Sequence, residues 1–172
     1  MKTFDDLKLS APVAQAVHEL GFVTPTPIQQ QALPVLLDGK TDFLGQAATG
    51  TGKTAAFGLP LVEASDPALK HVLHLVLCPT RELALQVCGQ LNLFGKHKHV
   101  KAIAIYGGTG YVEQLDGLKR GPSIVVGTPG RLIDHIDRGA LSLKNVKTVV
   151  LDEADEMISM GFKEDLEKIL RA

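Results

Sequence analysis

The chain has few cysteines, no excess of charge of one sign and no long hydrophobic run. Cys78 and Cys88 fit neither a metal-ligand nor a CxxC spacing, which indicates two buried core residues in a reducing setting. The 18 basic and 19 acidic residues balance, so any nucleic-acid binding must use individually placed residues. No apolar run approaches the roughly 20 residues of a membrane helix, and the start, MKTFDDLKLS, has no apolar targeting core. We therefore expect a soluble, cytoplasmic protein.

Short apolar runs rich in β-branched residues recur along the chain and predict buried strands. The length of 172 residues and the hydrophobic content of 45% suit one compact domain. The predicted strands are DFLG near 42, HLVLC near 74, VKAIAIY from 100, SIVVG from 123 and TVVLD from 148. The predicted helices between and after them are Glu82 to Leu93, Val112 to Leu118, Arg131 to Asp137 and Phe162 to Leu170. This alternation is typical of an α/β fold with a parallel sheet whose faces are both covered.

Two histidines, His97 and His99, lie in the stretch FGKHKHVK. They suggest a metal only weakly, because no carboxylate or thiol stands at ligand spacing. We expect this stretch to be a solvated surface loop.

The stretch AATGTGKT, residues 47–54, indicates a phosphate loop that carries Ala47 where the common pattern has its first glycine. A predicted strand precedes it and a predicted helix follows it, so amides at the helix start would point at an anion. Gly50 and Gly52 supply the backbone freedom for wrapping amides around phosphate. Lys53 would then neutralise phosphates and the Thr54 hydroxyl would hold Mg²⁺. The alternative is a glycine-rich turn that happens to carry a lysine.

The stretch VVLDEADEM places a carboxylate at the end of an apolar strand, where open α/β folds bind ligands. Asp152 can hold Mg²⁺ through water, and Glu153 is suited to orient the attacking water or accept its proton. Taken alone, such acidic residues are more often a helix start, where they offset the helix dipole. The phosphate loop makes the functional interpretation the stronger one.

Together with the phosphate loop, the tetrapeptide DEAD at residues 152–155 resembles the DEAD-box ATP-dependent RNA helicases of bacterial type. Four further blocks occur in that family's order: GFVTPTPIQ at 21–29 after Phe4, PTRELALQ at 79–86, the pair Gly107 and Gly108, and TPGRLID at 128–134. The resemblance covers Phe4 to Leu170 and accounts for Ala47, since this family commonly has alanine there. It implies a RecA-like P-loop NTPase domain with a mostly parallel β-sheet and helices on both faces. Residues 1–40 would be an adenine-recognition segment and residues 41–172 the ATP-binding domain.

The resemblance implies ATP and Mg²⁺ as cofactors and RNA, bound through its backbone without sequence preference, as a partner. The implied catalytic residues are Lys53, Asp152, Glu153 and Asp155, with Thr54 and Asp152 on the metal. The implied nucleotide-binding residues are Phe22, Thr24, Gln29, Ala48, Thr49, Gly50, Thr51, Gly52, Lys53 and Thr54. The implied RNA-binding residues are Pro79, Thr80, Arg81, Gly107, Gly108, Thr128, Pro129, Gly130 and Arg131.

Two of these assignments compete with ordinary helix capping. Thr26 and Gln29 form a possible capping box around Pro27, whereas the family assigns Gln29 a bidentate contact to adenine. Thr80 and Thr128 are possible helix caps, whereas the family places both on RNA phosphates. A capped helix is also a way of holding Gln29 in place.

The chain carries neither the family's Ser-Ala-Thr element nor its second RecA-like domain. The missing strand would leave a gap in the sheet beside the strand that ends at Asp152, unless the native chain is longer or another segment fills the gap. The second domain normally supplies arginines that stabilise the transition state, so we expect this chain alone to be nearly inactive as an ATPase. The competing hypotheses are a nucleotide- and RNA-binding module without turnover and a P-loop ATPase of another class.

Overall fold

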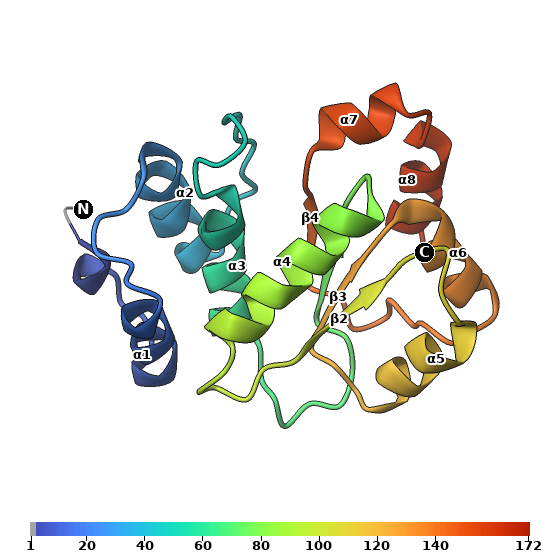
Figure 1. Ribbon diagram of the computed structural model, residues 1–172, viewed down its shortest axis with the longest axis horizontal. Helices are drawn as coiled ribbons and strands as arrows, with labels where there is room; N and C mark the ends of the chain where they lie inside the picture. The colour runs from blue at the N-terminus through green and yellow to red at the C-terminus, as the bar shows by residue number, and fades with distance from the viewer. Residues whose placement is uncertain (1–2) are drawn as a thin grey trace. The chain divides into compact units, whose positions relative to one another are not determined.

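Residues 3–172 are described by the structure, a computed structural model whose elements are labelled in Figure 1. The chain divides into two compact units. The first comprises Met1–Ser65 and Gln90–Val100, and the second comprises Asp66–Gly89 and Lys101–Ala172. The predicted division into residues 1–40 and 41–172 was based on function and not on compactness, and it stays a prediction. Among residues 3–172, none of the helices combines the length and apolar character that crossing a bilayer requires.

The first unit is helical. A short 3-10 helix, η1 (Phe4–Asp6), precedes α1 (Ala11–Glu19), α2 (Pro27–Asp38) and α3 (Lys53–Ala64), and α2 packs against α3. Helix α2 begins as its sequence predicts, with Thr26 at the N-cap and proline at the first helical position, where no backbone N–H is lost. The final turn of α4 (Arg81–Phe94) also belongs to this unit, and its Leu91 and Phe94 are buried.

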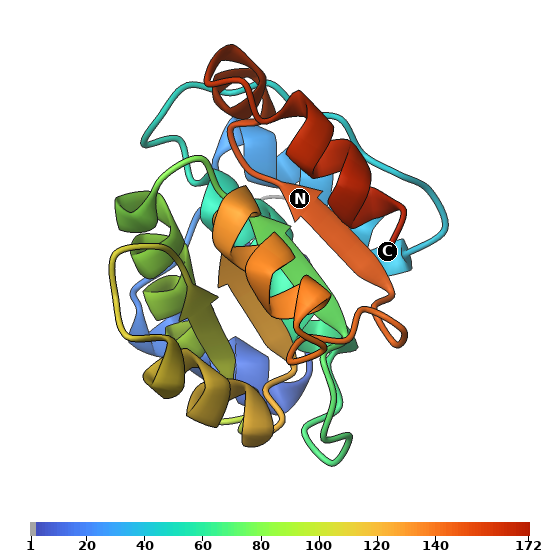
Figure 2. The ribbon, with the colours of Figure 1, turned by 90° about the vertical axis from the view of Figure 1, so that its right-hand side faces the viewer.

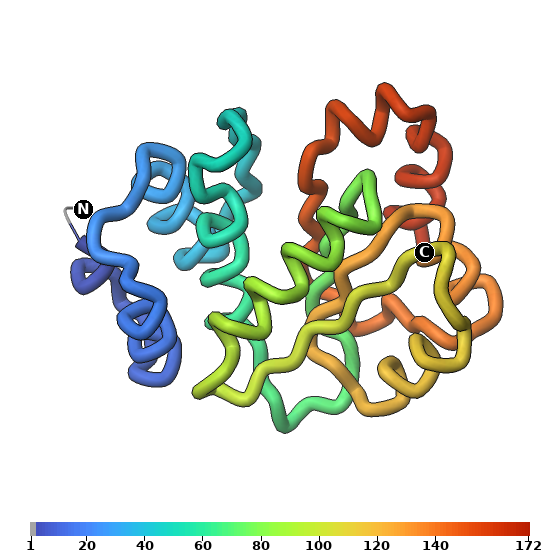
Figure 3. The backbone as a smooth tube through the Cα atoms, in the orientation of Figure 1, coloured from blue at the N-terminus to red at the C-terminus, as the bar shows by residue number. Residues whose placement is uncertain are grey.

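The strand predicted near residue 42 is wrong. Residues 42–48 have no regular secondary structure, and Leu44 is fully exposed. Figure 3 shows this part of the chain as an extended loop that leads from α2 to α3. A strand exists only when a neighbouring strand accepts and donates its backbone hydrogen bonds, and within residues 3–172 this segment has no such ladder. The local sequence therefore could not show whether a partner strand was present.

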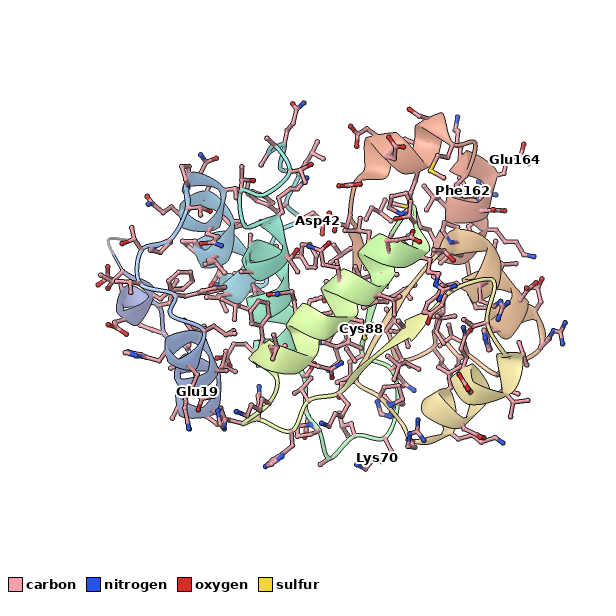
Figure 4. All side chains as sticks on the ribbon, in the orientation of Figure 1. Glu19, Asp42, Lys70, Cys88, Phe162 and Glu164 are labelled. Carbon is pink, nitrogen blue, oxygen red and sulfur yellow. The ribbon has the colours of Figure 1, made fainter. Side chains whose placement is uncertain are left out.

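The stretch with two histidines is a surface loop, as predicted, with Lys96 and His99 exposed, and ion pairs tie it to α1. His97 Nε2 lies 2.8 Å from Glu19 Oε1, and Lys96 Nζ lies 3.1 Å from the other carboxylate oxygen of the same residue. Hydrogen bonds, first from His97 and then from Lys96, hold the pKa of Glu19 at about 2. Figure 4 shows Glu19 at the end of α1. Among the described residues no group of three or more potential ligands gathers around a metal position, and His97 serves as an ion-pair partner.

The second unit is built on a parallel sheet of four strands. They are β1 (His74–Leu77), β2 (Ala102–Ile105), β3 (Ile124–Gly127) and β4 (Thr148–Leu151), in the order β2-β3-β1-β4. Each lies inside a run that the sequence predicted as a strand, and every ladder is parallel. The predicted fold class is confirmed.

The helices of the second unit cover the sheet. They are the start of α4, then α5 (Tyr111–Lys119), α6 (Pro129–Asp137), α7 (Ala154–Ser159) and α8 (Lys163–Leu170). One face of the sheet packs into a core that includes Leu75, Val125, Leu132, Met157 and Ile169. Figure 2 shows α6 (orange) in front of the strands and α8 (dark red) near β4. On the opposite face His74, Val76, Ile124 and Val126 are also buried, so both faces are covered.

Strand β4 forms one edge of the sheet. Among the described residues it pairs only with β1, and its Val149 and Leu151 are 39% and 38% exposed.

Candidate functional site

The phosphate loop lies in the first unit and ends at an open helix start. Gly50 and Gly52 have φ of 80° and 85°, a left-handed conformation that residues with a Cβ rarely adopt. Gly52 is the N-cap of α3, and Lys53 is its first residue. Thr51 Oγ1 donates to the Ala48 carbonyl at 2.6 Å, which stabilises the turn. The first amides of a 12-residue helix therefore lie beside a lysine, an arrangement suited to a polyphosphate.

Gln29 joins the predicted adenine-recognition segment to the predicted phosphate loop by a hydrogen bond. Its Oε1 accepts a hydrogen bond from the Thr26 N–H at 2.9 Å, as in a capping box, and its Nε2 donates to the Gly52 carbonyl at 3.1 Å. The side chain is only 4% exposed. A Cβ on Gly52 would stand 2.4 Å from Gln29 Nε2, so this hydrogen bond also requires glycine at the start of α3. The capping interpretation is thus observed, and it holds Gln29 against the loop.

Phe22 belongs to a line of three aromatic rings in the first unit. Its ring centroid lies 5.6 Å from that of Phe4 and 6.2 Å from that of Phe94, and the ring is half-buried. The Phe4 N–H donates to the Val23 carbonyl at 3.1 Å, which ties the start of the chain to this segment. Thr24 is exposed. One side of the Phe22 ring is therefore fixed by other aromatic rings, which leaves it rigid enough to stack on a planar ligand.

The acidic residues lie where β4 passes into α7. Asp152 is 7% exposed, and its N–H donates to the Leu77 carbonyl at 2.9 Å. Glu153 has φ of 54°, one of two non-glycine residues with positive φ among those described. Such a conformation costs free energy, and strained residues gather at functional sites. Asp155 is exposed on the first turn of α7.

Burial, with the charges of Asp152 and Glu153, raises the pKa of the Cys78 thiol, so this cysteine is an unreactive core residue as predicted.

The first half of the predicted RNA interface lies after β1 and β2. Thr80 Oγ1 accepts a hydrogen bond from the Leu83 N–H at 3.3 Å and so caps α4. The exposed Arg81 guanidinium lies 4.9 Å from the centroid of the Tyr106 ring. Tyr106 leads directly into the glycine pair, and Gly108 has φ of 81°. Both arginine and glycine backbone are thereby presented at the carboxyl ends of two strands.

The second half follows β3. Thr128 is the N-cap of α6, and Pro129 is its first residue. Gly127, just before them, can only be glycine, because a Cβ there would stand 2.6 Å from the Ile105 carbonyl oxygen. Arg131 points inward: its side chain is 16% exposed, and Nη1 donates to the Thr109 carbonyl at 3.3 Å and to Gln114 Oε1 at 3.4 Å.

The structure therefore groups the predicted residues by unit. The residues predicted to bind nucleotide lie in the first unit, and the acidic residues and those predicted to bind RNA lie in the second. The sequence did not predict a role for Tyr106, whose ring lies under the Arg81 guanidinium. It also did not predict one for Gln114, which contacts Arg131 and His135. Gln114 and His135 lie on the buried sides of α5 and α6, and no sequence motif marks either of them or Tyr106.

Comparison with known proteins supports one family across the chain. Residues 26–172 match the DEAD/DEAH box helicase family. The DEAD-box ATP-dependent RNA helicase CshA of Bacillus cereus is 55% identical over 170 residues, which cover 99% of this chain and 32% of that protein. The ATP-dependent RNA helicase DeaD of Escherichia coli is 54% identical over 169 residues, 98% of this chain and 27% of that protein.

A solved structure, of a DEAD box protein from the hyperthermophile Methanococcus jannaschii, superposes with a TM-score of 0.96 at 45% identity. It covers 100% of this chain, which spans 47% of that protein. The chain thus spans about a third of the length of the curated relatives and about half of the solved one. The predicted resemblance is confirmed, and the chain belongs to the DEAD/DEAH box helicase family.

Proposed function

We propose that this chain is the N-terminal, ATP-binding half of a DEAD-box ATP-dependent RNA helicase. It binds ATP with Mg²⁺ and the backbone of single-stranded RNA, and it couples ATP hydrolysis to remodelling of RNA duplexes. The relatives named above support the activity. The single observation that carries the proposal is the hydrogen bond from Gln29 to the Gly52 carbonyl, because it unites an adenine-recognition element and a phosphate loop in one unit.

The hydrogen bonds of Gln29 suit adenine rather than guanine. A side-chain amide has two donor hydrogens and two acceptor lone pairs, and Thr26 and Gly52 use one of each. One donor and one acceptor remain, which match N7 and the amino group of adenine, whereas guanine presents two acceptors at those positions. Phe22 stacks on the base, Thr24 lies beside it, and residues 48–54 with Lys53 hold the phosphates.

The acidic residues of the second unit supply the chemistry at the γ-phosphate. Thr54 and Asp152 offer hard oxygen ligands of the kind that Mg²⁺ prefers, and the bound ion neutralises charge on the phosphates. Glu153 orients the attacking water and accepts its proton, and Asp155 completes the acidic set.

RNA binds across the carboxyl ends of β1, β2 and β3 through its phosphates. The contacts come from Pro79, Thr80, Arg81, Gly107, Gly108, Thr128, Pro129, Gly130 and Arg131. Amides at helix starts, hydroxyl groups and arginines recognise phosphate and carry no base information, so binding is independent of sequence and sensitive to salt.

A second RecA-like domain is the partner that completes the enzyme. It supplies the transition-state arginines, and the two domains together hydrolyse ATP on RNA. In this proposal residues 1–40 form the adenine-recognition segment and residues 41–172 the first RecA-like domain. We place the protein in the cytoplasm, since the two cysteines are free thiols and suit a reducing compartment.

Titration of the chain with Mg-ADP and with Mg-GDP tests the proposal. We expect ADP to bind and GDP to bind at least about tenfold more weakly, because a wrong base leaves buried polar groups unpaired. Lys53→Ala should abolish ADP binding, whereas Lys144→Ala, an exposed lysine in the second unit, should leave it unchanged. Equal binding of both nucleotides would contradict the role of Gln29, and no binding of either would contradict a competent nucleotide site.

A further inference from the structure

Gln114 is a buried polar residue that no motif explains. It lies on α5 and is 7% exposed, and its amide has polar partners on both sides within the second unit. Nε2 donates to the Tyr106 carbonyl at 2.8 Å and to Thr109 Oγ1 at 2.9 Å. Oε1 accepts from Arg131 Nη1 at 3.4 Å and lies 3.0 Å from His135 Nε2. The amide therefore joins both ends of the glycine-pair loop to helix α6.

The partners fix the orientation of this amide. A carbonyl oxygen only accepts and a guanidinium only donates, so the NH₂ group must face Tyr106 and the oxygen must face Arg131. It follows that His135 donates through Nε2. Its Nδ1 has no hydrogen-bond partner among the described residues. Burial, and next the charge of Arg131, lowers the pKa of His135, which favours the neutral imidazole with its proton on Nε2.

His135 is held in place from its other side. Tyr111 stacks on the imidazole with centroids 4.3 Å apart and planes 7° apart, and the Arg138 guanidinium lies 4.7 Å from the Tyr111 ring centroid. Stacked rings have little freedom to rotate, so His135 presents its N–H to Gln114 in one orientation. A rigid donor on one side and a rigid carbonyl on the other leave the amide of Gln114 one low-energy position.

Both arginines of the predicted RNA interface depend on this amide. Arg131 bonds to it directly. Arg81 lies over the ring of Tyr106, whose carbonyl accepts the Gln114 N–H, and Arg81 Nη1 would lie 3.8 Å from a Cβ on Gly108. Gln114 thus holds both sides of the glycine pair, through the Tyr106 carbonyl before it and the Thr109 hydroxyl after it.

We propose that Gln114 is the positioning residue of the RNA interface: with His135 behind it, it sets the shape of the glycine-pair loop and the placement of Arg81 and Arg131. It acts through those residues and does not touch RNA itself. The inference rests on the proposed function, since it concerns the same RNA-binding surface.

Gln114→Met tests this role, because methionine has a similar size and cannot form the hydrogen bonds of the amide. The assay is binding of a fluorescein-labelled ten-nucleotide oligouridylate by the chain, measured by anisotropy at several KCl concentrations. We expect binding to weaken at least about tenfold, since misplaced arginines no longer form charge-assisted hydrogen bonds to phosphate. The slope of log K against log salt should also decrease by roughly 0.7 for each phosphate that the protein no longer neutralises. General destabilisation of the fold would not change this slope.

Three further single variants and one double variant keep the result interpretable. Gln15→Met, the same change at a position of α1 whose amide bonds only at the surface, should leave affinity and slope unchanged. Thr109→Val removes the hydroxyl that accepts from Gln114 and donates to the Tyr106 carbonyl, and it should give a smaller loss in the same direction if Gln114→Met fails to fold. Arg131→Ala should weaken binding in the native chain but add little to Gln114→Met, because coupled residues are not additive. Circular dichroism and thermal unfolding report folding in every protein.

The outcomes separate the inference from the function on which it rests. Oligouridylate binding by the native chain, with unchanged affinity and slope in both Gln114→Met and Thr109→Val, would overturn the role of Gln114 and leave the function standing. A full additive loss from Arg131→Ala in Gln114→Met would also overturn it. No binding by the native chain at any salt concentration would overturn the proposed RNA binding and the inference together.

Discussion

The stability of the protein should fall steeply in mild acid because of one buried histidine. His74, on β1, is 1% exposed, and neither ring nitrogen has a hydrogen-bond partner among the described residues. Burial, and next the charge of Lys147, lowers the pKa of His74 from 6.5 to about 4. As the pH falls, His74 is therefore protonated near pH 6.5 in the unfolded chain and only near pH 4 in the folded protein. The stability is fully present above pH 6.5 and is lost as the pH falls toward 4.

The magnitude follows from the two pKa values. Between pH 7 and pH 5 the folded protein should lose roughly 2 kcal/mol through this residue alone. His74→Leu removes the titration, and it should also raise the free energy of unfolding at pH 7 by about 1–3 kcal/mol, since two unpaired ring nitrogens leave the core.

Urea unfolding at pH 7 and pH 5, followed by circular dichroism, measures both effects. The decrease in stability between the two pH values should be about 2 kcal/mol smaller in His74→Leu than in the native chain. Val76→Ala, a change at a buried apolar position of the same strand, should cost about 2 kcal/mol equally at both pH values. A difference between the native chain and His74→Leu that does not change with pH would refute the reasoning, because every other titrating group is common to both proteins.

Three further changes test the two units. Gly52→Ala, which forces a Cβ to 2.4 Å from Gln29 Nε2 at a φ of 85°, should weaken ADP binding about tenfold or more by calorimetry, and unchanged affinity would contradict the geometry. Glu153→Gln, in a protein with both RecA-like domains, should bind ATP and release no phosphate, so retained turnover would exclude Glu153 as the base. Glu19→Gln should lower the Tm at pH 7. Because His97 and a neighbouring lysine hold the pKa of Glu19 at about 2, its stabilisation is present above pH 4.5, and the Tm difference should shrink as the pH falls from 4.5 toward 2.

The strands show where sequence reasoning works. Residues 74–77, 102–105, 124–127 and 148–151 were predicted from β-branched runs, and all four are strands. The run near residue 42, DFLG, contains no β-branched residue and is a loop with Leu44 fully exposed. It also lacks a hydrogen-bonding neighbour among the described residues, which is a property of other segments of the chain.

Gln29 shows why one pattern can support two interpretations. The sequence left helix capping and adenine recognition as alternatives, and the structure shows that the Thr26 N–H bond occupies only part of the amide. The second bond, to Gly52, crosses from α2 to the phosphate loop, and no spacing rule predicts it. Recognition and capping therefore do not exclude each other at this residue.

The sequence by itself determined the family, the order of the motifs and most of the secondary structure, because propensities, helix starts and glycine requirements act within a few residues. Only the tertiary structure decided the strand order β2-β3-β1-β4, the pairing of Glu19 with His97 and the hydrogen bonds of Gln114. These join segments far apart in the sequence, and a buried polar group shows its partners only after the chain has folded around it.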